Sequence, residues 1–243
     1  MTLRELRAIA CLKLGIAKWL FIHIPKNAGV AMAKHPELTN KLVRPEGSFH
    51  ISRAYTEELL SIMAENHEHH GKQHARWRDV KPSVRDKLQA VAIVRNPWSR
   101  VVSRYRFART VAKSGKSPQH EAPESFDAFL EQRHEYGGRP FYWHRAIRGW
   151  YPQSDYVTDE QGRLRTDILR QEQLSQDVPT YFGVTDPPKP RNLSRHKEKQ
   201  SYQDFYSPRT IQVVADWYAS DIELFGFDFD TPATRNFTEL KAR

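Results

Sequence analysis

Two short apolar segments, each followed by a turn and then by a helical pattern, most constrain how this chain can fold. The first covers residues 19–24 and is closed by Pro25. The second covers residues 90–94 and is closed by Arg95, Asn96 and Pro97. Short apolar runs bounded by turn signals are typical of buried strands in a parallel sheet. The alternation of such strands with helices predicts an α/β fold with a central, mostly parallel sheet flanked by helices.

Helical patterns surround these strands. They cover residues 3–17, 55–64, 97–111 and 125–133, and Ser207-Pro208 opens a last helix. The apolar face of that last helix comprises Ile211, Val214, Ala215, Tyr218, Ile222 and Phe225. Residues 35–53 indicate a loop, and residues 155–167, with Gly162 at the turn, indicate a short hairpin. The 243 residues suffice for one core, so we expect a single domain over residues 1–243.

The charge balance favours an anionic partner. Lys and Arg number 38 and Asp and Glu 29, giving a net charge of +9. This surplus suits a nucleotide, an acidic glycan, nucleic acid or a membrane surface, and it also suits mere solubility. No nucleic-acid-binding motif accompanies it, so we expect no specific nucleic-acid partner.

The cysteine count and the hydropathy indicate the compartment. Cys11 is the single cysteine, which excludes an intrachain disulfide and favours a reducing compartment. Residues 8–24 are the most membrane-like segment, but Lys13, Lys18 and His23 interrupt them, and no signal-peptide cleavage pattern follows. We therefore expect a cytoplasmic protein without a transmembrane segment. The sequence does not indicate an oligomeric state.

The first strand-to-helix junction has the features of a phosphate-binding loop. A strand that enters a tight turn before a helix directs successive N–H groups at one point, with the positive end of the helix behind them. Ala28 and Gly29 allow close approach to the backbone, and Lys26 adds a positive charge. The segment lacks the Walker A pattern, and a simple surface turn is the alternative interpretation.

The second junction adds an arginine at the carboxyl end of a strand, where open α/β sheets bind ligands. Ser103 follows Arg95 by two helical turns, so the two side chains could hold one phosphate together. The alternative is that Arg100, Arg104 and Arg106 form a solvated helix face, and we expect this for Arg106 and Arg109.

Both junctions resemble the loops of sulfotransferases that bind 3′-phosphoadenosine-5′-phosphosulfate (PAPS), in the usual order. Residues 25–31 are similar to the 5′-phosphosulfate loop P-K-[T]-[G/A]-G-T-S, and residues 95–105 match R-N-P-x-x-R-x-x-S-x-Y at every fixed position. Four further segments resemble motifs of the carbohydrate (family 2 type) branch, namely residues 72–76, 170–174, 192–194 and 218–227. The resemblance spans residues 19–229 and implies the sulfotransferase fold.

The resemblance also implies the site. The 5′-phosphosulfate would be bound by Pro25, Lys26, Asn27, Ala28, Gly29, Val30 and Ala31. Arg95 and Ser103 would bind the 3′-phosphate, Lys26 would stabilise the leaving oxygen, and no metal is needed. His74, in the histidine-containing stretch before the second strand, would be the base. Val30 and Ala31 stand where the family usually has Thr and Ser, which predicts weaker PAPS affinity or an altered donor pose.

Other residues leave alternatives open. We interpret His67, His69 and His70 as a surface cluster, and His50, Glu65 or Glu68 could replace His74 as base. The aromatic residues 141–144, Trp150 and Tyr151 could form an acceptor cleft, although core packing is favoured.

Three functional alternatives accompany a sulfotransferase that acts on an acceptor hydroxyl. They are a P-loop-like nucleotide kinase, a polyanion-binding protein, and a catalytically impaired protein that binds PAPS or the product 3′-phosphoadenosine-5′-phosphate (PAP). A kinase would need Ser or Thr after the lysine, whereas Asn27 follows Lys26. The resemblance to the carbohydrate branch indicates an acceptor hydroxyl on a carbohydrate or glycoconjugate, such as an acidic glycan. A lipid-linked sugar, a small metabolite and a tyrosyl peptide remain open as acceptors.

Overall fold

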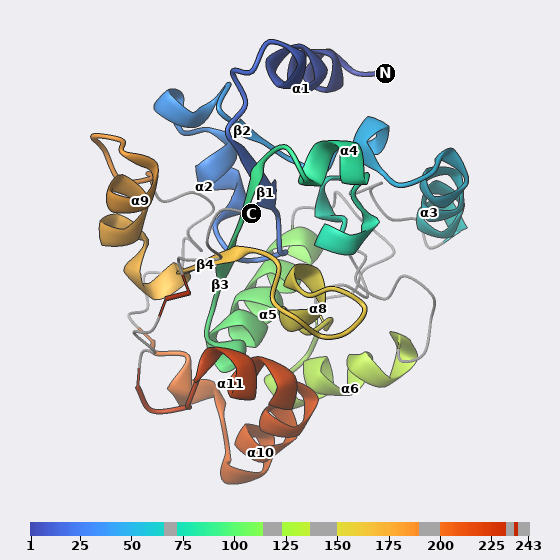
Figure 1. Ribbon diagram of the computed structural model, residues 1–243. Helices are drawn as coiled ribbons and strands as arrows, with labels where there is room; N and C mark the ends of the chain where they lie inside the picture. The colour runs from blue at the N-terminus through green and yellow to red at the C-terminus, as the bar shows by residue number, and fades with distance from the viewer. Residues whose placement is uncertain (66–71, 114–122, 137–149, 190–199, 232–235, 238–243) are drawn as a thin grey trace.

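The central element of the protein is a four-stranded, fully parallel sheet with the strand order β2-β1-β3-β4. We analysed a computed structural model, which describes residues 1–65, 72–113, 123–136, 150–189, 200–231 and 236–237 (Figure 1). The strands are β1 (Trp19–Ile22), β2 (Leu42–Val43), β3 (Gln89–Val94) and β4 (Asp167–Arg170). The expected α/β class with a parallel sheet is confirmed.

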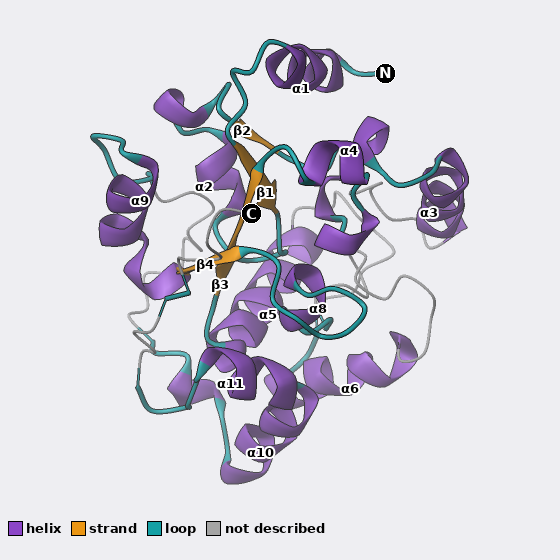
Figure 2. Cartoon of the chain, in the orientation of Figure 1, coloured by secondary structure: helices purple, strands orange, loops and turns teal. Residues whose placement is uncertain are grey.

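Helices cover both faces of this sheet (Figure 2). They are α1 (Leu3–Lys13), α2 (Gly29–Ala33), α3 (Arg53–Glu65), α4 (Pro82–Arg85), α5 (Pro97–Lys113), α6 (Phe126–Tyr136), α8 (Ser154–Val157), α9 (Leu174–Phe182), α10 (Pro208–Trp217) and α11 (Ala219–Phe225). Among the described residues, no helix is long and apolar enough to cross a membrane.

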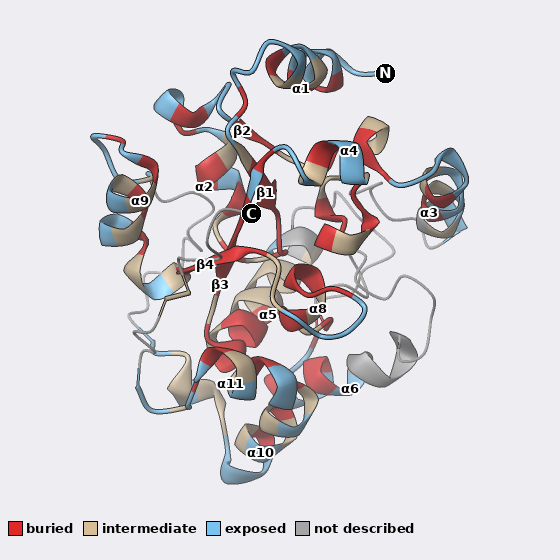
Figure 3. Ribbon diagram, in the orientation of Figure 1, coloured by how far each residue is buried: buried red, intermediate tan, exposed pale blue. Residues whose placement is uncertain are grey.

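Successive strand residues point to opposite faces and enter two separate cores. Leu20 and Ile22 of β1 pack in the larger core, which α1, α5, α10 and α11 also enter. Phe21 packs in the smaller core, beside Met32 of α2 and Val178 of α9. Side chains on both faces of the sheet are therefore buried, and most strand residues are coloured as buried in Figure 3. This explains the uninterrupted apolar pattern of residues 19–22 and 90–94.

Several predicted boundaries differ from the structure. The first helix ends at Lys13, four residues early, and Gly15 adopts a positive φ of 67° shortly after it. Strand β2 lies inside the predicted loop, where its two residues are too short to give a pattern. The predicted hairpin is reduced to one antiparallel bridge, Thr158 to Leu164, because α8 takes up its beginning. The last helix is divided at Tyr218 into α10 and α11.

Candidate functional site

The loop from β1 to α2 has an unusual backbone. Lys26 and Ala28 have positive φ values of 71° and 55°, and Ala28 caps α2 in the left-handed conformation. Left-handed conformations are unfavourable for residues other than glycine, and they cluster at functional sites where the surrounding structure enforces them. The sequence expectation of a tight turn before a helix is confirmed here.

Gly29, the first residue of α2, packs directly against an imidazole ring. A Cβ atom at this position would lie 1.8 Å from Nε2 of His23, which is buried at the end of β1. No side chain fits without displacement of the ring or the loop. The glycine is thus required by the close contact with His23, a reason that the sequence did not reveal.

This contact gives a test of the loop geometry. We expect Gly29→Ala to lower the free energy of unfolding by roughly 1–3 kcal/mol, the range for overpacking a filled site. Chemical denaturation measures the change, and Lys34→Ala, at an exposed position directly after α2, is the control. An unfolding free energy equal to that of the control would contradict the contact.

Arg95 follows β3 and lies beside this loop. Its Nε and Nη2 donate to Oγ of Ser99 at 2.9 and 2.7 Å, and its Nη1 donates to the Lys26 carbonyl at 3.5 Å. Burial lowers the pKa of Arg95 to about 10, so the guanidinium remains charged at neutral pH. Ser99 was missed by the sequence analysis, and Ser103 lies one turn further along the same face of α5.

Arg100 connects α5 to the first loop. The residue is 1% exposed, and it donates from Nε to the Pro25 carbonyl at 3.2 Å and from Nη1 to the Tyr151 carbonyl at 2.8 Å. The alternative that Arg100 belongs to a solvated helix face is therefore wrong. Its place at the second fixed Arg of the matched motif was the signal for this role.

Asn27 faces the protein interior. Its Nδ2 donates to the Ile93 carbonyl at 2.8 Å and to Oε1 of Gln153 at 2.7 Å, and the residue is buried. Its side chain is therefore bonded within the protein, and only its backbone could contribute to a ligand site. Val30 is 39% exposed, whereas Ala31 is buried.

Lys26 lies between the two junctions. Its ammonium is 4.2 Å from the centre of the Phe107 ring on α5, a distance typical of a cation–π interaction. Lys26 of the first loop therefore contacts α5, the helix that follows the second loop.

His74 is buried beside the strand that precedes the first loop. Its Nδ1 lies 2.8 Å from the His23 carbonyl, and the two imidazole rings are 4.2 Å apart. A carbonyl only accepts hydrogen bonds, so Nδ1 carries the proton and Nε2 of the neutral ring is the acceptor. This tautomer is suited to a general base.

The alternative bases differ in how they are bound. Both ring nitrogens of His50 have partners: Nδ1 accepts from the Thr56 hydroxyl at 3.0 Å and Nε2 donates to the Lys72 carbonyl at 3.1 Å. Burial lowers the pKa of His50. Glu65 is exposed at the end of α3, and Glu68, like the cluster of His67, His69 and His70, lies outside the described residues.

The aromatic residues considered for an acceptor cleft lie partly in the core and partly outside the described residues. Trp150 and Tyr151 are buried in the larger core, where Trp150 packs on Phe129 and Trp217. This agrees with the core alternative. Residues 141–144 and 192–194 lie outside the described residues.

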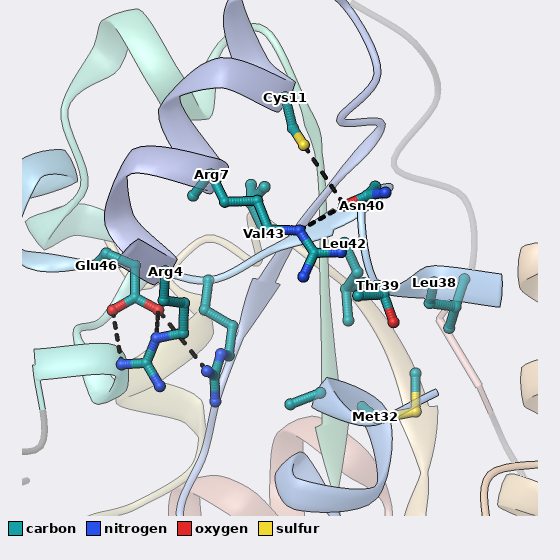
Figure 4. A pocket seen from close by; sticks show the side chains of 13 residues that line it. Arg4, Arg7, Cys11, Met32, Leu38, Thr39, Asn40, Leu42, Val43 and Glu46 are labelled. Atoms are coloured by element: carbon teal, nitrogen blue, oxygen red, sulfur yellow. Dashed lines mark hydrogen bonds and ion pairs between the residues drawn. The ribbon is translucent and has the colours of Figure 1, made fainter. Parts of the chain in front are cut away.

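A separate cavity of about 120 Å³ lies between α1, α2 and β2 (Figure 4). Arg4, Arg7 and Arg44 line it together with one carboxylate, Glu46. Glu46 pairs with Arg4 at 2.7 Å and with Arg44 at 3.8 Å, while Arg7 donates to the side chain of Asn40. The cavity is basic, and it contains none of the residues of the two loops.

Fold and site together define a parallel α/β protein with two basic loops at the carboxyl ends of adjacent strands. The family model of the sulfotransferase family matches residues 17–228, most of the chain. The protein therefore belongs to the sulfotransferase family and is a transferase of sulfonate groups. A search among curated proteins found no significant match. In the described part of the chain, no group of three or more His, Cys, Asp or Glu side chains could hold a metal ion.

Proposed function

We propose that this protein transfers a sulfonate group from PAPS to an acceptor hydroxyl. The observation that carries the proposal is the meeting of the two loops, where Arg95 reaches the Lys26 carbonyl at 3.5 Å. Strands β1 and β3 are direct neighbours, so their carboxyl ends place both loops at one edge of the sheet. A nucleotide with an anionic group at each end of its ribose suits such a pair of basic loops.

In this proposal the residues have distinct roles. The backbone of residues 25–31 and Lys26 hold the 5′-phosphosulfate, and Arg95 with Ser99 and Ser103 holds the 3′-phosphate. The acceptor oxygen attacks sulfur in line while the bond from sulfur to the phosphate oxygen breaks. Nε2 of His74 takes the acceptor proton, and Lys26 stabilises or protonates the leaving oxygen.

An acidic carbohydrate is the acceptor that we propose. The net charge of +9 supports an anionic acceptor. Arg44 directly follows β2, which runs parallel to β1 and pairs with its first two residues. Its guanidinium is mostly buried, and it lies 3.8 Å from a carboxylate that Arg4 also binds. It could therefore pair with a further anionic group.

Stabilisation by PAP tests the donor. A ligand that binds only the native state raises the melting temperature, so we expect PAP to do so without magnesium. Mg-ATP should have a smaller effect, because the loop after β1 lacks the Walker A pattern that binds magnesium nucleotides. Thermal melting at millimolar ligand measures both. Stabilisation by Mg-ATP with none by PAP would favour the kinase alternative.

A further inference from the structure

Gln153 occupies the position directly before α8 and is fully buried at 0% exposure. Its side-chain amide makes four hydrogen bonds. Oε1 accepts from Nδ2 of Asn27 at 2.7 Å and from the backbone N–H of Arg95 at 2.9 Å. Nε2 donates to the Arg95 carbonyl at 2.8 Å and to Oδ2 of Asp221 at 3.1 Å. One amide therefore bonds to both loops at once.

The polarity of these partners requires a glutamine. The N–H groups of Asn27 and Arg95 only donate, whereas the Arg95 carbonyl and the Asp221 carboxylate accept. The amide must therefore present its oxygen to the first pair and its nitrogen to the second. Because it bonds both backbone groups of Arg95, it acts as a neighbouring strand would, at a point where β3 has already ended.

The backbone at Gln153 is held in place by the carboxylate of Asp221. Its backbone N–H donates to Oδ2 of Asp221 at 2.9 Å, and the N–H of Ser154 donates to Oδ1 at 2.8 Å. Asp221 lies on α11 and is fully buried. The amide thus has a defined position relative to the core, and a displacement of either loop would break at least one of its bonds.

We infer that Gln153 is a positioning residue that sets the spacing between the two anion-binding loops. The inference rests on the proposed function, since it assigns one end of PAP to each loop. Two linked groups bind cooperatively only when the distance between their sites fits the ligand, so the spacing controls the gain from the second phosphate. Gln153 touches neither phosphate in this account, and it acts through Asn27 and Arg95.

The test compares a nucleotide that engages both loops with one that engages a single loop. Gln153→Glu keeps the shape but places a carboxylate against the Arg95 carbonyl and Asp221. Calorimetry with both ligands gives a preference ratio, the dissociation constant of adenosine 5′-phosphate divided by that of PAP. We expect this ratio to fall about tenfold or more in the variant, because the benefit of simultaneous binding is lost. A role in stability alone would weaken both ligands equally and leave the ratio unchanged.

A second variant and a control keep the result decisive. If Gln153→Glu does not fold, Asn27→Ala removes one bond of the amide and should lower the same ratio in a folded protein. Ser154→Ala is the matched control, because its hydroxyl contacts Ser220 and neither loop. An unchanged ratio in the folded variants, with wild type preferring PAP, overturns the inference. A wild type that shows no preference for PAP overturns the proposed function instead.

Discussion

Replacement of His74 by alanine should leave PAP affinity nearly intact while turnover falls by about a hundredfold or more, as loss of a general base does. The imidazole lies beside the first loop, and its Nδ1 donates to the His23 carbonyl, so Nε2 is the nitrogen that would accept a proton in the neutral ring. Lys26→Ala should differ: it should lower turnover and also weaken donor binding, because the proposed function assigns Lys26 to the group on which charge develops.

The pH dependence separates a base from a structural histidine. Histidine ordinarily titrates near neutral pH, and only its neutral form accepts a proton. Activity of the wild type should therefore fall as the pH drops below neutrality, and His74→Ala should lose this limb. His50→Gln is the control, because both nitrogens of His50 are bonded within the protein. An active His74→Ala enzyme with the wild-type profile would refute the assignment, and His50 and Glu68 would then be tested as bases.

Arg95→Ala should cause the largest loss of donor affinity. It removes a charge-assisted fork and leaves the 3′-phosphate without its cation, which costs about 2–4 kcal/mol for such a pair. Calorimetry with PAP measures the loss. Ser103→Ala should cost less, and so should Ser99→Ala, since each removes a neutral hydroxyl.

A charge-matched variant controls for the general basicity of the protein. Arg209→Ala removes one positive charge from an exposed position on α10, where the guanidinium lies 3.8 Å from the carboxylate of Asp127. Its PAP affinity should equal that of the wild type. An equal loss in Arg95→Ala and Arg209→Ala would mean that PAP senses net charge and not a specific clamp.

The parts of the fold that could be predicted are those governed by local patterns. Residues 19–22 and 90–94 are apolar at every position because both faces of the sheet are covered, so the buried strands were evident. Ser207 was a good helix start because its hydroxyl accepts from the N–H of Thr210. Strand β2 escaped notice since two residues show no periodicity.

Long-range contacts explain most of what could not be predicted at the site. Arg100 bonds to Pro25 across 75 residues of sequence, and Asn27 bonds to Gln153 across 126. Local spacing carries no information about such partners. In the sequence of a helix, a solvated arginine cannot be distinguished from a fully buried one. Asn27 was predicted to bind the ligand together with its neighbours, although its side chain faces Gln153.

The residues predicted to bind the donor lie where the parallel sheet brings strand ends together. Lys26 follows β1, Arg95 follows β3, and the pairing of these strands makes their loops adjacent. That the strands are neighbours is a property of the topology, which the two motifs alone did not reveal. The roles assigned to Lys26, His74, Arg95 and Ser103 stay predictions.

Binding of PAP to the wild-type protein in magnesium-free buffer is the most direct test of the central claim. Titration calorimetry should give one PAP site per chain, with a markedly weaker affinity for adenosine 5′-phosphate because the second loop then has no phosphate to bind. Equal affinities for the two nucleotides, or binding of Mg-ATP with none of PAP, would contradict the account.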